Sequence, residues 1–173
     1  FISKAVQRLT KLQNLYLANS PITYDNIATD WEDATSEYAK QYADEELSWS
    51  NLKDLTDVEL YNCPKLTQIP EFVYDLPELQ LLNVACNKGI SADQLTADWK
   101  RLADDEDTGP KVQILYLGYN NLEKFPESES LRKMVKLGLL DCVHNNVNHL
   151  EAFGTDVKLS DLMLSYNQIE EIP

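Results

Sequence analysis

One stretch of the chain constrains its fold more than any other, because apolar residues and one asparagine recur in it at fixed spacings. Val112, Leu115, Leu117, Asn120 and Leu122 follow the pattern L-x-x-L-x-L-x-x-N-x-L, with valine in the first place. Alternation sends Leu115 and Leu117 to the same side of a short strand. The asparagine can then turn the chain inward, and its amide can bond backbone groups that the turn leaves unpaired. This stretch predicts a short strand followed by a tight turn.

The same spacing occurs six times, in copies that start at residues 12, 55, 79, 112, 137 and 159. The residues at the turn position are, from the first copy to the last, Ser20, Cys63, Asn87, Asn120, Asn145 and Asn167. We expect these side chains to form a structural ladder between successive copies, weaker at its N-terminal end, where serine and cysteine replace asparagine. The second and third copies carry one extra residue after the turn position, which predicts a small bulge in each.

The repeated pattern resembles that of the leucine-rich repeat (LRR) superfamily, and the resemblance covers essentially the whole chain. It implies an α/β fold: a right-handed β-α superhelix, or solenoid. A parallel sheet would line its concave face, and short helices or 3₁₀ turns its convex face. The I-P and L-P steps, irregular copy lengths and acidic balance are similar to those of bacterial repeat proteins that are exported or displayed on the cell surface. Proteins of this superfamily usually bind another protein on the concave face.

Two copies are too long for one ordinary coil. Successive copies start 43, 24, 33, 25 and 22 residues apart, whereas one coil takes about 20 to 29 residues. We therefore expect helical insertions at about 23–50 and 91–108, the second opened by a capping box of Ser91 and Gln94. Neither end of the chain shows the polar cap that a solenoid needs. Residues 1–173 are interpreted as a single repeat domain, truncated at both ends, from a longer array.

Stacking the copies predicts which residues occupy the concave face, because strand residues between the template leucines point away from the core. Five of the nine tyrosines fall on this surface. Tyrosine gives a large, stiff contact area and is enriched at binding interfaces; alternatively, aromatic residues there only stabilise cross-strand pairs. The candidate binding residues are Tyr16, Glu59, Tyr61, Asn83, Tyr116, Tyr119, Asp141, His144, Met163 and Tyr166.

Composition narrows the classes of partner. Acidic residues outnumber basic ones by 29 to 15, and a net charge of −14 argues against nucleic acid, which is held by clustered Lys and Arg. No apolar run approaches the roughly 18 residues that could span a bilayer. The three cysteines are too few for a disulfide framework, so we expect them to be reduced. Free thiols are typical of a reducing compartment such as the cytoplasm, whereas the resemblance favours an extracellular or cell-surface location; both stay open.

Nothing in the sequence indicates an enzyme, a metal site or a cofactor. Cys86 and His144 share an offset within their copies, but strand spacing separates them by roughly 10 Å, whereas a thiol and its base need about 3 Å. Residues Asp104–Asp107 have the composition of a calcium loop without its alternating ligand spacing, which indicates a solvated loop.

The resulting hypothesis is a non-catalytic module that recognises a protein or peptide with its tyrosine-rich concave face. Two alternatives remain. In the first, the chain is a structural spacer within a longer surface protein. In the second, its tyrosines bind carbohydrate by stacking on sugar rings.

Overall fold

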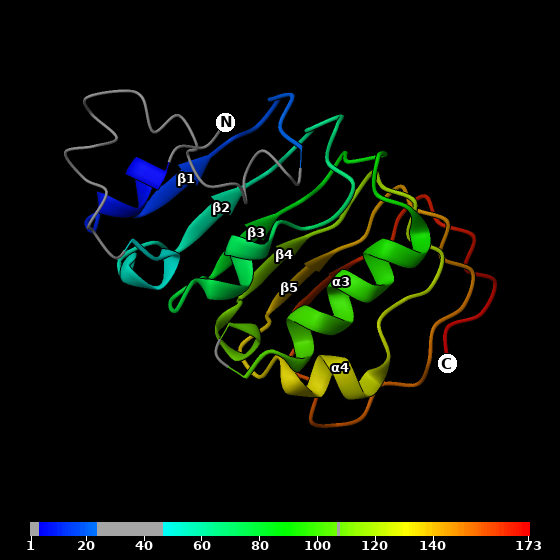
Figure 1. Ribbon diagram of the computed structural model, residues 1–173. Helices are drawn as coiled ribbons and strands as arrows, with labels where there is room; N and C mark the ends of the chain where they lie inside the picture. Colours follow the sequence, from blue (N-terminus) through cyan, green and yellow to red (C-terminus); the bar gives the residue numbers. More distant parts are fainter. Residues whose placement is uncertain (1–3, 24–46, 107) are drawn as a thin grey trace.

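A computed structural model describes residues 4–23, 47–106 and 108–173. Its centre is one parallel sheet of six three-residue strands, arranged in sequence order from β1 to β6 (Figure 1). The helical segments lie along the other side of the chain's coils. The strands are β1 (Asn14–Tyr16), β2 (Asp57–Glu59), β3 (Leu81–Asn83), β4 (Ile114–Tyr116), β5 (Leu139–Asp141) and β6 (Asp161–Met163). The helical segments are η1 (Lys4–Arg8), η2 (Trp49–Asn51), η3 (Glu71–Asp75), α3 (Ala92–Asp104), η4 (Gly109–Lys111) and α4 (Ser128–Lys133).

The core lies between the sheet and the helical segments, and apolar residues at the template positions form about half of it. Leu115 of β4 is fully buried, and Leu117, directly after this strand, is 1% exposed. The register pairs Leu115 with Leu82 on one side and with Leu140 on the other, so equivalent leucines of neighbouring copies stack directly. Each copy therefore buries its apolar side only by contact with the copies before and after it.

The helix in the third coil begins where the sequence predicts an N-cap. Ser91 Oγ accepts a hydrogen bond from Gln94 N at 3.2 Å, and Leu95, Trp99 and Leu102 form the buried stripe of α3. The capping box is incomplete, however. The Gln94 side chain donates to Asp98 Oδ1 at 2.7 Å instead of reaching back to Ser91. The other predicted insertion, at 23–50, lies almost wholly outside the described residues.

The asparagine ladder joins successive coils through their backbones. Asn87 Nδ2 donates to Leu60 O and Val84 O, one in the preceding coil and one in its own, at 2.9 and 2.8 Å. Asn120 Nδ2 repeats the arrangement one coil later with Val84 O and Leu117 O, both at 3.0 Å. Asn145 and Asn167 donate in the same way to pairs of carbonyls. Each asparagine thus ties its own turn to the previous coil.

The side chains at the first two ladder positions make weaker hydrogen bonds than the asparagines do. Cys63 Sγ donates to Leu17 O of the preceding coil at 3.2 Å. Ser20 Oγ donates only to Ala18 O, within its own turn, at 3.5 Å.

The extra residue in the second and third copies changes which backbone N–H donates to the ladder asparagine of the next coil. In these copies the next template residue is bonded inside its own turn, by Leu66 N to Cys63 O and by Ile90 N to Asn87 O. The following asparagine then accepts from the turn residue itself, as Asn120 Oδ1 does from Asn87 N at 2.6 Å. Without the extra residue, Leu122 N has no such local bond and donates to Asn145 Oδ1 at 3.0 Å. What the sequence predicts as a bulge is thus a hydrogen-bonded turn.

None of the described helices is long and apolar enough to cross a membrane.

Leu117→Ala tests the packing. It should lower the free energy of unfolding by about 2–5 kcal/mol, because it leaves a cavity between two stacked copies. Chemical denaturation measures this. Leu164 holds the same template position in the last copy but is only half-buried, so Leu164→Ala should cost clearly less. Equal losses would contradict the stacking account.

Asn120→Ala tests the ladder. It should cost about 1–3 kcal/mol, because Asn87 N, Val84 O and Leu117 O all lose a buried partner. Ser20→Ala at the equivalent position should cost less than about 0.5 kcal/mol, since Ser20 binds only its own turn. Thermal melts of the two variants provide the comparison, and a Ser20→Ala loss as large as that of Asn120→Ala would refute the ladder account.

Candidate functional site

The sheet face opposite the core carries a row of side chains, each from the last residue of its strand. The strand register places these residues side by side. We call them the second row, because another row lies earlier along the strands. Tyr16 and Met163 are exposed at its two ends, and the members between them are half-buried. The second row runs Tyr16, Glu59, Asn83, Tyr116, Asp141 and Met163.

A parallel row lies two residues earlier in each strand, on the same face. This first row has three aliphatic residues in its centre, each half-buried, with an aspartate on either side of them. Its members are Asn14, Asp57, Leu81, Ile114, Leu139 and Asp161. An apolar stripe therefore crosses three strands, with a carboxylate on the next strand at each end.

A third line of side chains follows the strands, and here the structure corrects the sequence prediction. Tyr61, Tyr119, His144 and Tyr166 were expected on strands but lie in the turns after them. The residue before each ladder position has a positive φ in all six copies, between 51° and 62°. Because all six share it, this left-handed conformation belongs to the repeat itself rather than to one binding site. This turn row is Asn19, Asn62, Cys86, Tyr119, His144 and Tyr166.

Side chains of the turn row contact one another from coil to coil. The rings of Tyr119 and His144 are stacked with centroids 4.2 Å apart, and those of His144 and Tyr166 with centroids 4.0 Å apart. At the other end of the row, Asn62 Nδ2 donates to Asn19 Oδ1 at 2.8 Å. The aromatic half of the row is therefore a continuous, preformed stack that continues the edge of the sheet.

Three of the predicted site residues also have local structural roles. Asn83 Oδ1 accepts from Ala85 N at 3.0 Å, and Asp141 Oδ1 accepts from Val143 N at 2.9 Å. Each side chain thus holds the start of its turn with one oxygen. A hydrogen bond with Cys86 raises the pKa of the Tyr61 hydroxyl, which stays protonated at neutral pH.

Comparison with solved structures identifies the architecture. Over its whole length the chain is 80% identical to a leucine-rich repeat protein from Bacteroides thetaiotaomicron VPI-5482, with a TM-score of 0.94. It is 58% identical, again over its whole length, to a leucine-rich repeat protein from Bacteroides eggerthii DSM 20697, with a TM-score of 0.92. The chain belongs to the leucine-rich repeat superfamily. It spans 21% and 28% of the lengths of those two proteins.

A more distant similarity supports the fold alone. An internalin C2 from Listeria monocytogenes strain 4b F2365 matches 96% of the chain at 19% identity, with a TM-score of 0.56, and the match covers 67% of that protein. No protein-family model and no curated protein matches the chain. Together with the six-stranded parallel sheet, the structural matches show a leucine-rich repeat solenoid, in which the first, second and turn rows lie on the concave side.

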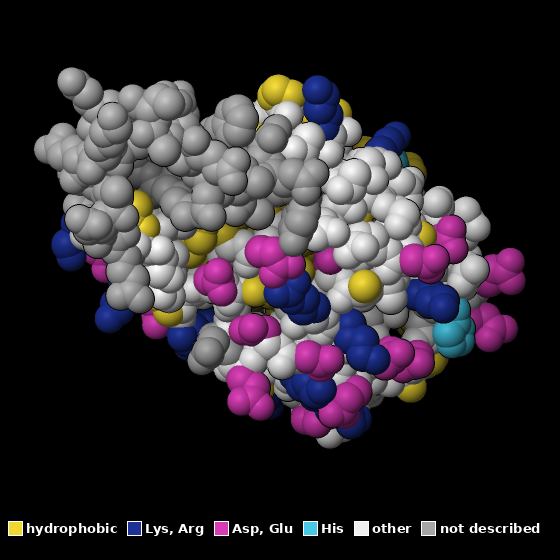
Figure 2. Space-filling view, in the orientation of Figure 1, with side chains coloured by type: hydrophobic (Ala, Val, Ile, Leu, Met, Phe, Trp, Pro, Cys, Tyr) yellow, Lys and Arg dark blue, Asp and Glu magenta, His cyan; other side chains and the backbone are white. Residues whose placement is uncertain are grey.

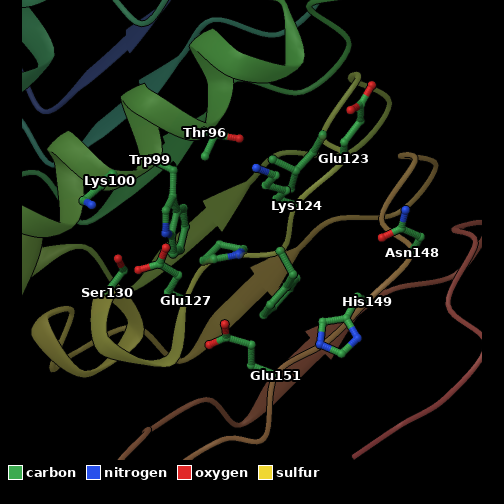
Figure 3. Close-up of a pocket in the computed structure, with 13 residues that line it drawn as sticks. Thr96, Trp99, Lys100, Glu123, Lys124, Glu127, Ser130, Asn148, His149 and Glu151 are labelled. Carbon is green, nitrogen blue, oxygen red and sulfur yellow. The ribbon is translucent and has the colours of Figure 1, made fainter.

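The irregular repeat lengths produce a hollow on the opposite side of the solenoid. Here α3 stands beside the extended segment 122–127 of the next coil, and a cavity of about 330 Å³ lies between them (Figure 3). Trp99 of α3 is buried in its wall, and the indole Nε1 has no hydrogen-bond partner in the described structure. The lining carries three glutamates, two lysines and a histidine. Such a mixture of opposite charges selects no class of ligand, so we place the candidate site on the sheet.

The acidic run of the third coil has structural partners. Asp104 Oδ1 accepts from Lys133 Nζ at 2.6 Å, and this bond lowers the pKa of Asp104. Asp105 Oδ1 accepts from Thr108 N at 2.6 Å. Among the described residues no group of acidic, histidine or cysteine side chains could hold a metal ion. As for the thiol and imidazole pair, Tyr119 occupies the turn-row position between Cys86 and His144 and stacks on the histidine.

The three thiols are free and differ in access. Cys63 and Cys142 are fully buried, and burial raises the pKa of both. Cys86 is half-buried in the turn row.

We expect Cys86 to be the one thiol that reacts rapidly in the native repeat domain, because the thiolate is the reactive form and burial both hides it and disfavours it. Titration with a chromogenic disulfide should give about one fast equivalent per chain and about three after denaturation. Cys86→Ser should abolish the fast phase, whereas Cys63→Ser should leave it unchanged. A fast phase that survives Cys86→Ser would contradict this assignment.

Proposed function

We propose that this leucine-rich repeat domain is a non-catalytic recognition module that binds a protein or peptide on the concave face of its sheet. The observation that carries the proposal is where the exposed large hydrophobic side chains gather. Nine such residues are found in the described part of the chain, and five of them lie on the second row, on the turn row or between these rows. These five are Tyr16, Tyr61, Tyr119, Met163 and Tyr166. Exposed aromatic clusters of this kind are typical of interfaces.

The rigidity of the surface supports recognition as well. Rings stacked on each other and side chains bonded to their own turns lose little conformational freedom when a partner arrives, which lowers the entropic cost of binding. A structural spacer has no need for such a surface.

The stacking also favours a protein over a carbohydrate. A sugar ring binds to the free face of an aromatic ring. Both faces of His144 are covered by Tyr119 and Tyr166, and each tyrosine uses one face in the same stack. The stack therefore leaves no free face on His144 and only one on each tyrosine, while its ring edges and the Tyr119 and Tyr166 hydroxyls suit hydrogen bonds and apolar contacts with a polypeptide.

The test is capture of binding proteins by the intact protein and by its Tyr116→Ala, Tyr119→Ala double variant. We expect a partner that wild type retains and the double variant loses, with a fall in affinity of at least about tenfold, as for two interface aromatics. Circular dichroism and a thermal melt establish that the variant is folded.

A matched double variant, Leu9→Ala with Val135→Ala, removes two exposed hydrophobic side chains away from the sheet. It should retain the partner. Equal capture by wild type and the tyrosine variant, or loss in both double variants, would contradict recognition by the concave face and favour the spacer alternative.

A further inference from the structure

The concave face carries negative charge that no salt bridge among the described residues neutralises. Asp57, Glu59, Asp141 and Asp161 lie in the first and second rows, and neither row contains a lysine or an arginine. His144 of the turn row is the basic side chain beside them. In the part of the chain that the structure describes, none of the four carboxylates takes part in a salt bridge.

Several acidic residues away from this face do have a basic partner. Arg101 forms a bidentate pair with Glu71 at 2.7 and 2.5 Å across two coils, and Lys111 lies 3.4 Å from Glu78. Lys133 pairs with Asp104, Arg132 with Asp156 and Lys11 with Asp54. Figure 2 shows the resulting mixture of acidic and basic side chains over the helical side. Each of the described salt bridges thus lies away from the two rows, whose four carboxylates have no basic partner among the described residues.

The two first-row acids are also held in place. Thr56 Oγ1 lies 3.3 Å from Asp57 Oδ2, and Ser160 Oγ lies 2.9 Å from Asp161 Oδ2; each hydroxyl shares its proton between the carboxylate and a backbone carbonyl of the preceding coil. The two hydroxyls stand directly before equivalent first-row positions, four strands apart. Each aspartate therefore keeps one oxygen oriented by the chain and the other available to a ligand.

Spacing along the rows gives the charges a geometry. Neighbouring strands lie about 4.8 Å apart, so Asp57 and Asp161 are roughly 19 Å apart and Glu59 and Asp141 roughly 14 Å apart. Between the two aspartates lie Leu81, Ile114 and Leu139. The face therefore presents an apolar centre with a negative group at each end.

We propose that the partner contributes a basic polypeptide segment that crosses the strands, with apolar residues at its centre and Lys or Arg on both sides. This inference rests on the proposed recognition function and names the chemistry of the partner. A separation of 14 to 19 Å corresponds to about four to six residues of extended chain or about nine to thirteen residues of helix. Arginine suits the face best, because its guanidinium binds a carboxylate through two N–H groups and also stacks on tyrosine.

The probe is a pair of fluorescent peptides of identical composition, measured by fluorescence anisotropy with the intact protein. One has arginines at both ends of an apolar centre, and the other alternates arginine with the same apolar residues. We expect tighter binding of the first peptide. Asp57→Asn with Asp161→Asn should weaken its binding about 3- to 10-fold, as for the loss of two ion pairs, while the amides retain the bonds to Thr56 and Ser160.

The matched control removes the same charge from the helical side. Glu123→Gln with Glu151→Gln lowers the net negative charge equally, at two exposed positions that line the hollow, and should change binding less than about twofold. Equal weakening by both double variants would show attraction by net charge alone and overturn the inference. Equal affinity for the two peptides would overturn the proposed geometry.

The two proposals fail separately. If the protein partner is lost by the tyrosine variant but retained by Asp57→Asn with Asp161→Asn, recognition stands and the basic segment is wrong. If both variants retain the partner, both proposals are wrong.

Discussion

The structure depends on the bonds that asparagine side chains make between coils. A three-residue strand followed by a left-handed turn leaves backbone groups that neither strand nor helix satisfies. Asn87, Asn120, Asn145 and Asn167 each supply two donors and one acceptor to these groups, and each spans two coils. Because the bonds run between coils, no copy is complete alone. Stacked leucines add burial, but the ladder sets the register at which they stack.

That register is what makes a surface out of separate coils. Once the turn residues are aligned, the residue before each of them must also be aligned, in the same left-handed conformation. Tyr119, His144 and Tyr166 come into contact for this reason, although 25 and 22 residues separate them along the chain. Left-handed φ is unfavourable for such side chains. The aromatic stack offsets part of this cost, so the exposed edge of the sheet contributes to stability.

The sequence predicts the periodic parts of this architecture because each position in the template has a single structural job. Strand positions, the burial of Leu115 and Leu117 and the helix after Ser91 all follow from spacing and capping. Two features without a sequence signature were missed. The left-handed φ cannot be recognised from the residue type, because Asn, Cys, Tyr and His all occupy the position. The capping box was predicted in full, but the Gln94 side chain donates to Asp98 instead of to the backbone of Ser91. Tyr61 and Tyr119 were assigned to the correct face, but to strands rather than turns.

Pairing of the charges was equally invisible in the sequence, and among the described residues it occurs away from the two sheet rows. Arg101 and Glu71 are 30 residues apart, and Lys133 and Asp104 are 29 apart, so only the stacking of coils brings them together. Carboxylates that are paired in this way have little to gain from a charged partner. The concave side combines unpaired carboxylates, an aliphatic stripe and rigid aromatic rings. A partner that buries this surface must contribute cations. Without them, the free-energy cost of burying a carboxylate would exceed the gain from the apolar contacts beside it.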